Sequence, residues 1–206
     1  MNAIFDKETQ LYYRIIPTHT WPTFEISGIR MHRTKDVDPK KDTELKIQAI
    51  KPIRGTVLDT CTGLGYTAIL AAKQEGVTKV ITVEKDRNVI YLQENNEFSK
   101  ELFTNQKIKR IHGDILEVIN EFNENYFDAI IHDPPSMKIA GELYSEEFYR
   151  RLYAVLKPNG KLFHYTGSPG IKTGKDIISG MMRRLERAGF RNVKRADSAL
   201  GVIGVK

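Results

Sequence analysis

A glycine loop between an apolar run and an amphipathic segment constrains the fold more than any other feature. The run 56–59 ends in Asp59, and the loop 60–65 leads into TAILAAKQEG, which has the spacing of a helix. Because glycine has no Cβ, Gly63 and Gly65 let the backbone turn tightly and approach a ligand. The free N–H groups at the start of the helix would face that ligand. This unit predicts an α/β domain with a small-molecule site at the loop.

The rest of the chain repeats the alternation of short apolar runs and amphipathic segments. We expect strands at 56–59, 79–84, 108–112, 127–132, 161–166, 191–196 and 199–206. Helices are expected at 65–76, 86–97, 114–122, 145–157 and 176–189. Such alternation predicts a parallel sheet with right-handed crossovers. The short connection between the last two strands predicts an antiparallel hairpin at one edge.

The N-terminal residues 1–41 differ from the domain predicted over 42–206. They are rich in aromatic side chains, and FEISGIRMHR has the pattern of a β-hairpin that turns at Ser27 and Gly28. A helix is expected over 42–50. This extension either covers a substrate pocket or seals one edge of the sheet, and the sequence supports both alternatives equally.

Four consecutive predicted strands are each followed or ended by an acidic residue, namely Asp59, Glu84, Asp114 and Asp133. The carboxyl ends of parallel strands meet at one edge, where open α/β sheets bind ligands. A lone acid at such a position often only caps a helix. Asp133, however, precedes Pro134 and Pro135, which fix a rigid turn, and has no evident role in a core. The ordered set therefore favours a binding site.

These motifs, with LKPNG at 156–160, resemble those of class I S-adenosylmethionine-dependent methyltransferases over about residues 42–206. Residues 132–160 are most similar to a group of predicted archaeal methyltransferases. The resemblance implies a Rossmann-like methyltransferase fold of the α/β class. Its seven-stranded sheet would be mostly parallel, with an antiparallel last hairpin and helices on both faces. The cofactor would be S-adenosylmethionine, held by Asp59, Thr60, Cys61, Gly63, Gly65, Thr67, Glu84, Lys85, Asp114, Ile115 and Asp133.

The resemblance also implies roles within this set. The methionine end of the cofactor would lie at the glycine loop, the ribose at Glu84, and the adenine at Asp114 and Ile115. The catalytic residues would be Asp133, Pro134 and Pro135, which favour a nitrogen acceptor. Two positions depart from the family pattern. Cys61 replaces the usual first glycine, and Ser136 replaces the aromatic residue of amino-methylating members, which argues against methylation of adenine or cytosine amino groups.

The net charge of +6 bears on the acceptor. Much of the basic excess lies near the C-terminus, and a basic face helps a protein approach a polyanion. We therefore predict an RNA acceptor bound by the basic C-terminal face, although a solvated surface also explains the charge. A small molecule or a protein side chain stays open as acceptor. The substrate contacts predicted here are Ser136, Tyr144, Arg183, Arg184 and Arg187.

Several functions are disfavoured by residue usage. One cysteine and five histidines without ligand spacing predict no disulfide and no metal site. Cys61 is expected to be a small buried residue and not a nucleophile, and His132 and His164 to be half-buried structural residues. With no apolar run of about 20 residues and no secretion signal, we expect a cytoplasmic protein without a membrane partner. The oligomeric state cannot be read from the sequence.

Three other functions remain as alternatives. The stretch GELYSEEFYRRLYAVLKPNG also resembles polyamine synthases, which suggests an aminopropyltransferase that uses decarboxylated S-adenosylmethionine. A polycationic acceptor suits a chain of net charge +6 poorly. The spacing of Gly63, Gly65 and Ala68 also matches a dinucleotide-binding fingerprint and would suit a nicotinamide-dependent oxidoreductase. The last alternative is an RNA-binding module that has kept the fold without the chemistry.

Overall fold

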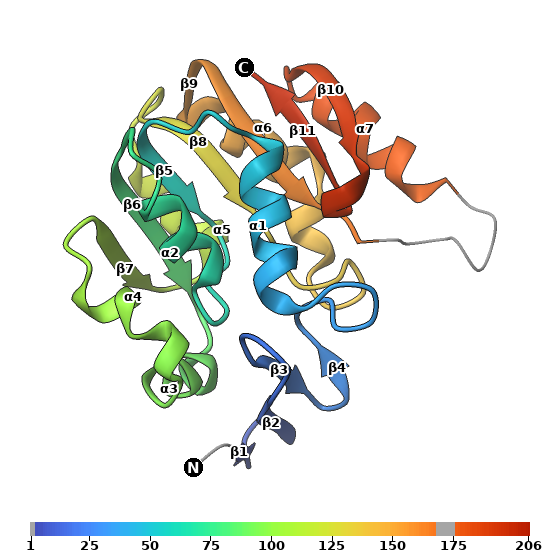
Figure 1. Cartoon of the computed structure of the whole chain (residues 1–206). Helices are drawn as coiled ribbons and strands as arrows, with labels where there is room; N and C mark the ends of the chain where they lie inside the picture. Colours follow the sequence, from blue (N-terminus) through green and yellow to red (C-terminus); the bar gives the residue numbers. More distant parts are fainter. Residues whose placement is uncertain (1–2, 168–175) are drawn as a thin grey trace.

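The computed structural model describes residues 3–167 and 176–206, which form two sheets with helices packed around the larger one (Figure 1). The larger sheet has seven strands in the order β10-β11-β9-β8-β5-β6-β7. Their bounds are β5 Gly55–Asp59, β6 Val77–Glu84, β7 Ile108–His112, β8 Phe127–His132, β9 Leu156–Tyr165, β10 Arg191–Ala196 and β11 Gly201–Val205. Strands β5 to β9 pair in parallel, and β11 pairs antiparallel with both β9 and β10. The predicted Rossmann-like sheet is therefore confirmed.

Helices cover both faces of this sheet because its strands bury alternate side chains in two separate cores. Val57 packs with α1 and α2 on one face, whereas Leu58 packs with α5, α6 and α7 on the other. The α-helices are α1 Pro39–Ala49, α2 Tyr66–Ala72, α3 Arg87–Glu94, α4 Glu101–Thr104, α5 Ile115–Val118, α6 Glu146–Val155 and α7 Ile177–Arg187. The short 3-10 turns are η1 Glu97–Ser99, η2 Ile119–Glu121, η3 Gly141–Tyr144 and η5 Asp197–Ala199.

Side-chain caps set several helix starts. Asp86 accepts a hydrogen bond from the backbone N–H of Asn88, and Ser145 accepts one from Phe148, as expected for N-cap residues. Helix α1 begins at Pro39, earlier than predicted, because Asp38 caps it and proline is favoured in the first turn.

One predicted boundary between helix and strand was wrong. Helix α6 already ends at Val155, and β9 begins at Leu156, so the stretch 158–160 lies within the strand. Leu156 is fully buried and pairs with Phe127, and the register shifts directly afterwards. This irregularity lets the strand accommodate a proline, which cannot donate to the ladder.

The N-terminal segment forms a second, antiparallel sheet of four strands near the carboxyl ends of the parallel strands (Figure 1). Its strands are β1 Ala3–Asp6, β2 Leu11–Ile16, β3 Thr23–Ile26 and β4 Ile29–Arg30. The predicted turn at Ser27 and Gly28 is present, and both residues have the positive φ that such hairpins require. Strands β1 and β2 were not predicted. Among the described residues this sheet does not pair with the larger one.

Candidate active site

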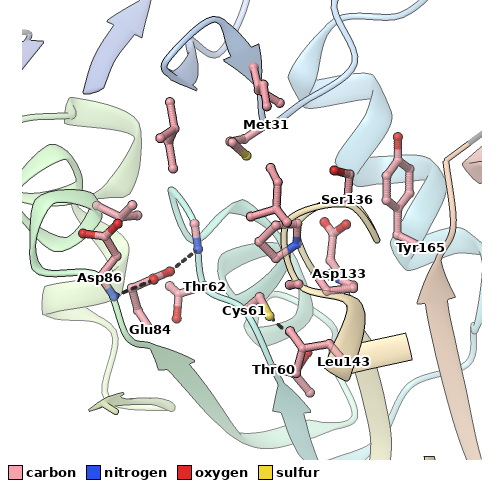
Figure 2. Close-up of a pocket in the computed structure, with 18 of the residues that line it drawn as sticks. Met31, Thr60, Cys61, Thr62, Glu84, Asp86, Asp133, Ser136, Leu143 and Tyr165 are labelled. Carbon is pink, nitrogen blue, oxygen red and sulfur yellow. Dashed lines mark hydrogen bonds between the residues drawn. The ribbon is translucent and has the colours of Figure 1, made fainter. Parts of the chain in front are cut away.

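A cavity of about 1190 Å³ lies between the carboxyl edge of the larger sheet and the N-terminal sheet. In Figure 2, Glu84 and Asp86 lie on one side of it and Asp133 and Ser136 on the other, with Met31 above. The predicted site residues that line the cavity are Thr60, Cys61, Gly63, Thr67, Glu84, Lys85, Asp114, Ile115, Asp133, Pro134, Pro135, Ser136 and Tyr144. Those that do not line it are Asp59, Gly65, Arg183, Arg184 and Arg187.

Asp59 lies beneath the glycine loop instead of facing the cavity. Its side chain is fully buried, and its two oxygens accept hydrogen bonds from the hydroxyls of Thr67 at 2.9 Å and Thr82 at 2.6 Å. Burial raises the pKa of Asp59 to about 7, against the opposing effect of both hydroxyls. Asp59 therefore supports the loop from below, and the predicted direct contact with the cofactor is replaced by this supporting role.

Gly65 also does not line the cavity, and its lack of a side chain instead allows close packing. It has a φ of 81° and precedes α2, and the side chain of Leu102 occupies the space where a Cβ would lie. Gly63 does line the cavity, with a φ of 52° and the ring of Phe24 packed 3.6 Å from the position of an added Cβ. The amide of Gln93 donates to the Gly63 carbonyl at 2.6 Å. The loop is thus fixed from both sides, by α3 and by the N-terminal sheet.

Glu84 ends β6 and faces the cavity. One of its oxygens accepts from the backbone N–H of Gly63 at 2.9 Å and the other from that of Asp86 at 3.0 Å (Figure 2). Burial raises the pKa of Glu84 to about 7, although both N–H groups favour the charged form. The hydroxyl of Tyr13 donates to Asp86 at 2.8 Å, so the N-terminal sheet is attached at this point.

Asp114 combines the two roles considered for it. One oxygen caps α5 by accepting from the N–H of Leu116 at 3.0 Å, and the other lies 3.3 Å from the ammonium nitrogen of Lys85. Its side chain still lines the cavity, as does the neighbouring Ile115. Capping of the helix and contact with a ligand are therefore compatible here.

Asp133 is joined to a buried lysine that the sequence reasoning missed. The ammonium of Lys46, on α1, lies 2.7 Å from Asp133 and 3.0 Å from Asp42, and its side chain is only 2% exposed. Burial alone would lower the pKa of Lys46, but the carboxylates of Asp133 and Asp42 raise it above the usual value. The ring of Tyr165 lies 4.4 Å from the same ammonium. The only signal was the spacing of Asp42 and Lys46, which is equally typical of exposed helix pairs.

The loop after Asp133 is held by hydrogen bonds to its backbone. The hydroxyl of Tyr144 donates to the carbonyl of Pro135 at 2.9 Å and so positions the loop. Tyr144 also lines the cavity, and its contact with substrate stays a prediction. The Nε2 of His132 lies 2.9 Å from the carbonyl of Leu143 and must donate, because a carbonyl only accepts. Its Nδ1 then accepts from the hydroxyl of Thr60 at 2.7 Å. These contacts anchor both ends of the loop.

The two histidines are fully buried, more so than predicted. Tyr149 donates to Nε2 of His164 at 2.8 Å, and the two imidazole rings lie 4.5 Å apart. Burial lowers the pKa of His132 to about 4 and holds that of His164 well below its usual value. Both are therefore neutral near pH 7 and act as structural residues at the ends of β8 and β9.

Cys61 lines the cavity, but its thiol is a poor nucleophile. Burial raises its pKa well above the usual value, and the carboxylate of Glu84 acts in the same direction. Within residues 3–167 and 176–206 no cluster of side chains has the arrangement of a metal site. No helix in those ranges is long and apolar enough to cross a bilayer.

The arginines predicted to contact substrate lie on α7 and are engaged elsewhere. Arg184 donates from Nε to the carbonyl of Tyr144 at 3.0 Å, and Arg187 pairs with Glu146 at 2.6 Å. Arg183 is exposed but does not line the cavity. Arg184 thus contacts the predicted site residue Tyr144, but none of the three arginines lines the cavity.

The cavity fits S-adenosylmethionine, the cofactor implied by the sequence. Drug-sized ligands usually occupy clefts of about 300–1,000 Å³, so the volume suffices for the cofactor and leaves room beyond it. Glu84 and Asp114 offer carboxylate oxygens along one half, as the hydroxyl and amino groups of a nucleoside require. The Gly63 loop lies where the methionine end would follow.

Comparisons with known proteins agree with this geometry. Residues 79–198 match the model of a family described as S-adenosyl-L-methionine-dependent methyltransferases. The protein MJ1233 of Methanocaldococcus jannaschii is 54% identical over 197 residues, which cover 95% of this chain and 67% of that protein. A polyamine aminopropyltransferase of Sulfolobus acidocaldarius is 33% identical over 111 residues, or 52% of this chain and 37% of that enzyme.

Solved structures show the same fold at low sequence identity. A spermidine synthase in complex with the transition state analogue AdoDATO aligns with a TM-score of 0.77 at 19% identity, over 100% of this chain and 74% of that one. A putative S-adenosyl-L-methionine-dependent methyltransferase from Methanococcus maripaludis aligns with a TM-score of 0.59 at 19% identity, over 82% of this chain and 85% of that one. On the family match and the identity to MJ1233, this chain belongs to the S-adenosyl-L-methionine-dependent methyltransferases, enzymes that use this cofactor.

Proposed function

We propose that the protein transfers a methyl group to a nitrogen atom of a small acceptor that binds between Asp133 and the N-terminal sheet. The observation that carries this proposal is the position of Asp133. It lies at the edge of the larger sheet, inside a cavity with more room than the cofactor needs, and before a loop fixed by Tyr144 and His132.

S-adenosylmethionine, when bound, supplies a methyl group on a positively charged sulfur. The nitrogen lone pair of the acceptor forms the new C–N bond, the C–S bond breaks with its electrons going to sulfur, and the surplus proton on nitrogen leaves to water. The carboxylate of Asp133 stabilises the positive charge that arises on nitrogen. The rigid 134–135 turn holds that carboxylate in place, and the covering sheet limits access of water to the reacting atoms.

Transfer of an aminopropyl group is the second candidate, favoured by the likeness to aminopropyltransferases. A polyamine acceptor needs uncompensated carboxylates for its several positive charges. At the acceptor end of this cavity Asp133 instead belongs to a cluster of two carboxylates and two cations. Lys46 lies 2.7 Å from Asp133 and 3.0 Å from Asp42, and Arg33 lies 3.4 Å from Asp42, so the cluster carries no net charge. This pairing supports an acceptor with a single amine over a polycation, and therefore supports methyl transfer.

An RNA acceptor remains a prediction from the net charge. Of the three arginines expected to bind it, Arg184 and Arg187 already contact Tyr144 and Glu146, and all three lie outside the cavity. A protein side chain is likewise untested as acceptor. Neither class gains support from the residues that line the site.

The two group transfers can be distinguished with purified protein. We would offer simple primary amines and putrescine, each with S-adenosylmethionine or with its decarboxylated form, and follow products by mass spectrometry. The proposal expects a mass increase of one methyl group, only with the carboxylated cofactor, and its loss in Asp133→Asn. Aminopropylated putrescine formed from the decarboxylated cofactor would overturn it in favour of the second candidate.

A further inference from the structure

We infer that the acceptor subsite takes an amine carried on an apolar body, with one positive charge at the Asp133 end and none at the other. This inference rests on the proposed nitrogen methylation and adds the chemical class of the substrate. Three features of the cavity carry it: an apolar ceiling, an apolar side wall, and positive charges at the rim.

The ceiling is the cavity-facing side of the N-terminal sheet. In a strand alternate side chains share a face, and here Leu11 and Tyr13 of β2 and Phe24 and Ile26 of β3 all line the cavity. Tyr13 and Ile26 are directly paired across the two strands. The part of this apolar face that contains Tyr13 and Phe24 packs against Leu64 and Val89 beside the glycine loop. The apolar face continues past this contact, through Ile26, Ile29 and Met31, over the open part of the cavity.

The side wall comes from the loop after β8 and from the start of α7. Met137, Ile139 and Leu143 follow Asp133 in the chain, and Ile177 is the first residue of α7. All four line the same cavity as the ceiling residues. The side chains of Ile29 and Ile139 are 47% and 50% exposed, although burial of large apolar side chains is favourable in free energy. An apolar ligand body between the two walls would cover both.

The charges around this apolar region argue against a second amine. Arg30 and Lys138 are exposed side chains that line the cavity from the two walls, where these two cations outnumber the exposed acid Glu142. An acceptor with a positive charge at its far end would bring that charge toward both of them. Asp133 is the acid next to the reacting end, and Lys46 already balances it. The pattern suits an amine with an apolar body and a neutral or negative far end.

The test compares octylamine with 1,8-diaminooctane, which has the same chain length but a second charge. Binding to the cofactor-loaded protein is measured by calorimetry, and methylation by label transfer from S-adenosylmethionine. We expect octylamine to bind at least about tenfold more tightly, because burying an unpaired charge in apolar surroundings is costly. Ile139→Asp should weaken the binding of octylamine and strengthen the binding of the diamine. Phe5→Asp is the matched control, since Phe5 is 52% exposed on the N-terminal sheet but does not line the cavity.

The outcomes separate this inference from the proposed function. Equal or tighter binding of the diamine, or identical effects of Ile139→Asp and Phe5→Asp, would overturn the apolar subsite even if amines are methylated. If octylamine is preferred and Ile139→Asp reverses that preference, the subsite is supported. A preferred but never methylated octylamine would contradict nitrogen methylation while still supporting the apolar subsite.

Discussion

The two ends of the cavity hold their acidic residues in different ways. At the cofactor end, Asp59 and Glu84 accept hydrogen bonds only from neutral donors, namely threonine hydroxyls and backbone N–H groups. At the acceptor end, Asp133 is bound to the buried ammonium of Lys46. Burial raises the pKa of both Asp59 and Glu84 to about 7. It also raises the pKa of Asp133, although there the ammonium of Lys46 opposes the shift.

This difference suits the two ligands. A cofactor with a sulfonium, an ammonium and hydroxyl groups brings partners for Glu84, a carboxylate that lines the cavity and has no cation of its own. An acceptor that reacts through a lone pair must instead be a neutral amine at the moment of transfer. A carboxylate that is already paired with Lys46 attracts a protonated amine less than an unpaired carboxylate would. It still stabilises the positive charge that forms on the acceptor nitrogen during transfer. The predictions below test this contrast, from the largest expected effect to the smallest.

Removing Lys46 is expected to have the largest effect. Lys46→Ala leaves Asp42 and Asp133 without their shared cation, and breaking a buried ion pair usually costs about 3–5 kcal/mol. Urea unfolding followed by circular dichroism would measure the loss. The control is Lys41→Ala on the same helix, whose exposed pair with Glu44 at 3.8 Å should contribute less than about 1 kcal/mol. Equal destabilisation by both variants would show that the buried ion pairs contribute no more to stability than the exposed pair does.

Neutralising Asp133 should affect the reaction more than the cofactor. Asp133→Asn is expected to lower the rate of methyl transfer about 100-fold, because a group that stabilises transition-state charge is lost. Cofactor affinity, measured by calorimetry, should change little. Asp36→Asn, in an exposed loop outside this cavity, serves as the control. A loss of cofactor affinity equal to the loss of rate would place Asp133 at the cofactor end instead.

Neutralising Glu84 should give the opposite pattern. Glu84→Gln replaces a carboxylate whose two oxygens each accept from a backbone N–H group with an amide, whose single oxygen can accept but whose NH2 group cannot. We expect cofactor affinity to fall about tenfold or more, since hydrogen bonds to charged groups contribute about 1.5–3 kcal/mol. Glu94→Gln, exposed on the following helix, is the control. Unchanged affinity in Glu84→Gln would remove Glu84 from the cofactor site.

The raised pKa of Asp59 predicts a pH-dependent difference in stability. Its carboxyl binds a proton more readily in the folded chain, at a pKa of about 7, than at the usual 3.8. The stability from this group is therefore present at low pH and is lost as the pH rises through about 7. Asp59→Asn lacks this loss, so its stability relative to the unaltered protein should rise by on the order of 1 kcal/mol between about pH 5 and about pH 8. Urea unfolding of the cofactor-free proteins would measure it, and a constant or falling difference would contradict the assigned pKa direction.

Charge reversal on α7 should have the smallest effect. Arg183→Glu with Arg187→Glu removes two exposed positive charges and one surface pair, which usually contributes less than about 1 kcal/mol. Methylation of small amines should be unchanged, because neither residue lines the cavity. A filter-binding assay at low salt would measure RNA binding by the same double variant. Loss of both RNA binding and methyl transfer would revive the RNA acceptor.

The larger sheet and the gathering of acidic residues at one of its edges could be predicted because they depend on local patterns. Each acid follows a recognisable strand, and the parallel order brings the strand ends to one edge. The direction of a side chain was harder to predict. Asp59 turned out to lie under the loop, since hydroxyls from α2 and β6 occupy both of its oxygens.

The contacts of the first 50 residues with the site could not be predicted because they join segments that are distant in the chain. Lys46 contacts Asp133 across 87 positions, and Tyr13 contacts Asp86 across 73. No local pattern distinguishes Lys46 from a lysine on an exposed helix face. Strands β1 and β2 escaped prediction because their sequences, AIFD and LYYRII, do not alternate regularly between apolar and polar residues.

The most direct test of the account is a label-transfer experiment. The protein would be incubated with methyl-labelled S-adenosylmethionine and extract from its source cells, and the products would be divided into RNA, protein and small-molecule fractions. The account predicts label on a nitrogen atom in the small-molecule fraction, resistant to ribonuclease and protease and absent with Asp133→Asn. Label confined to RNA or protein, or undiminished in that variant, would contradict it.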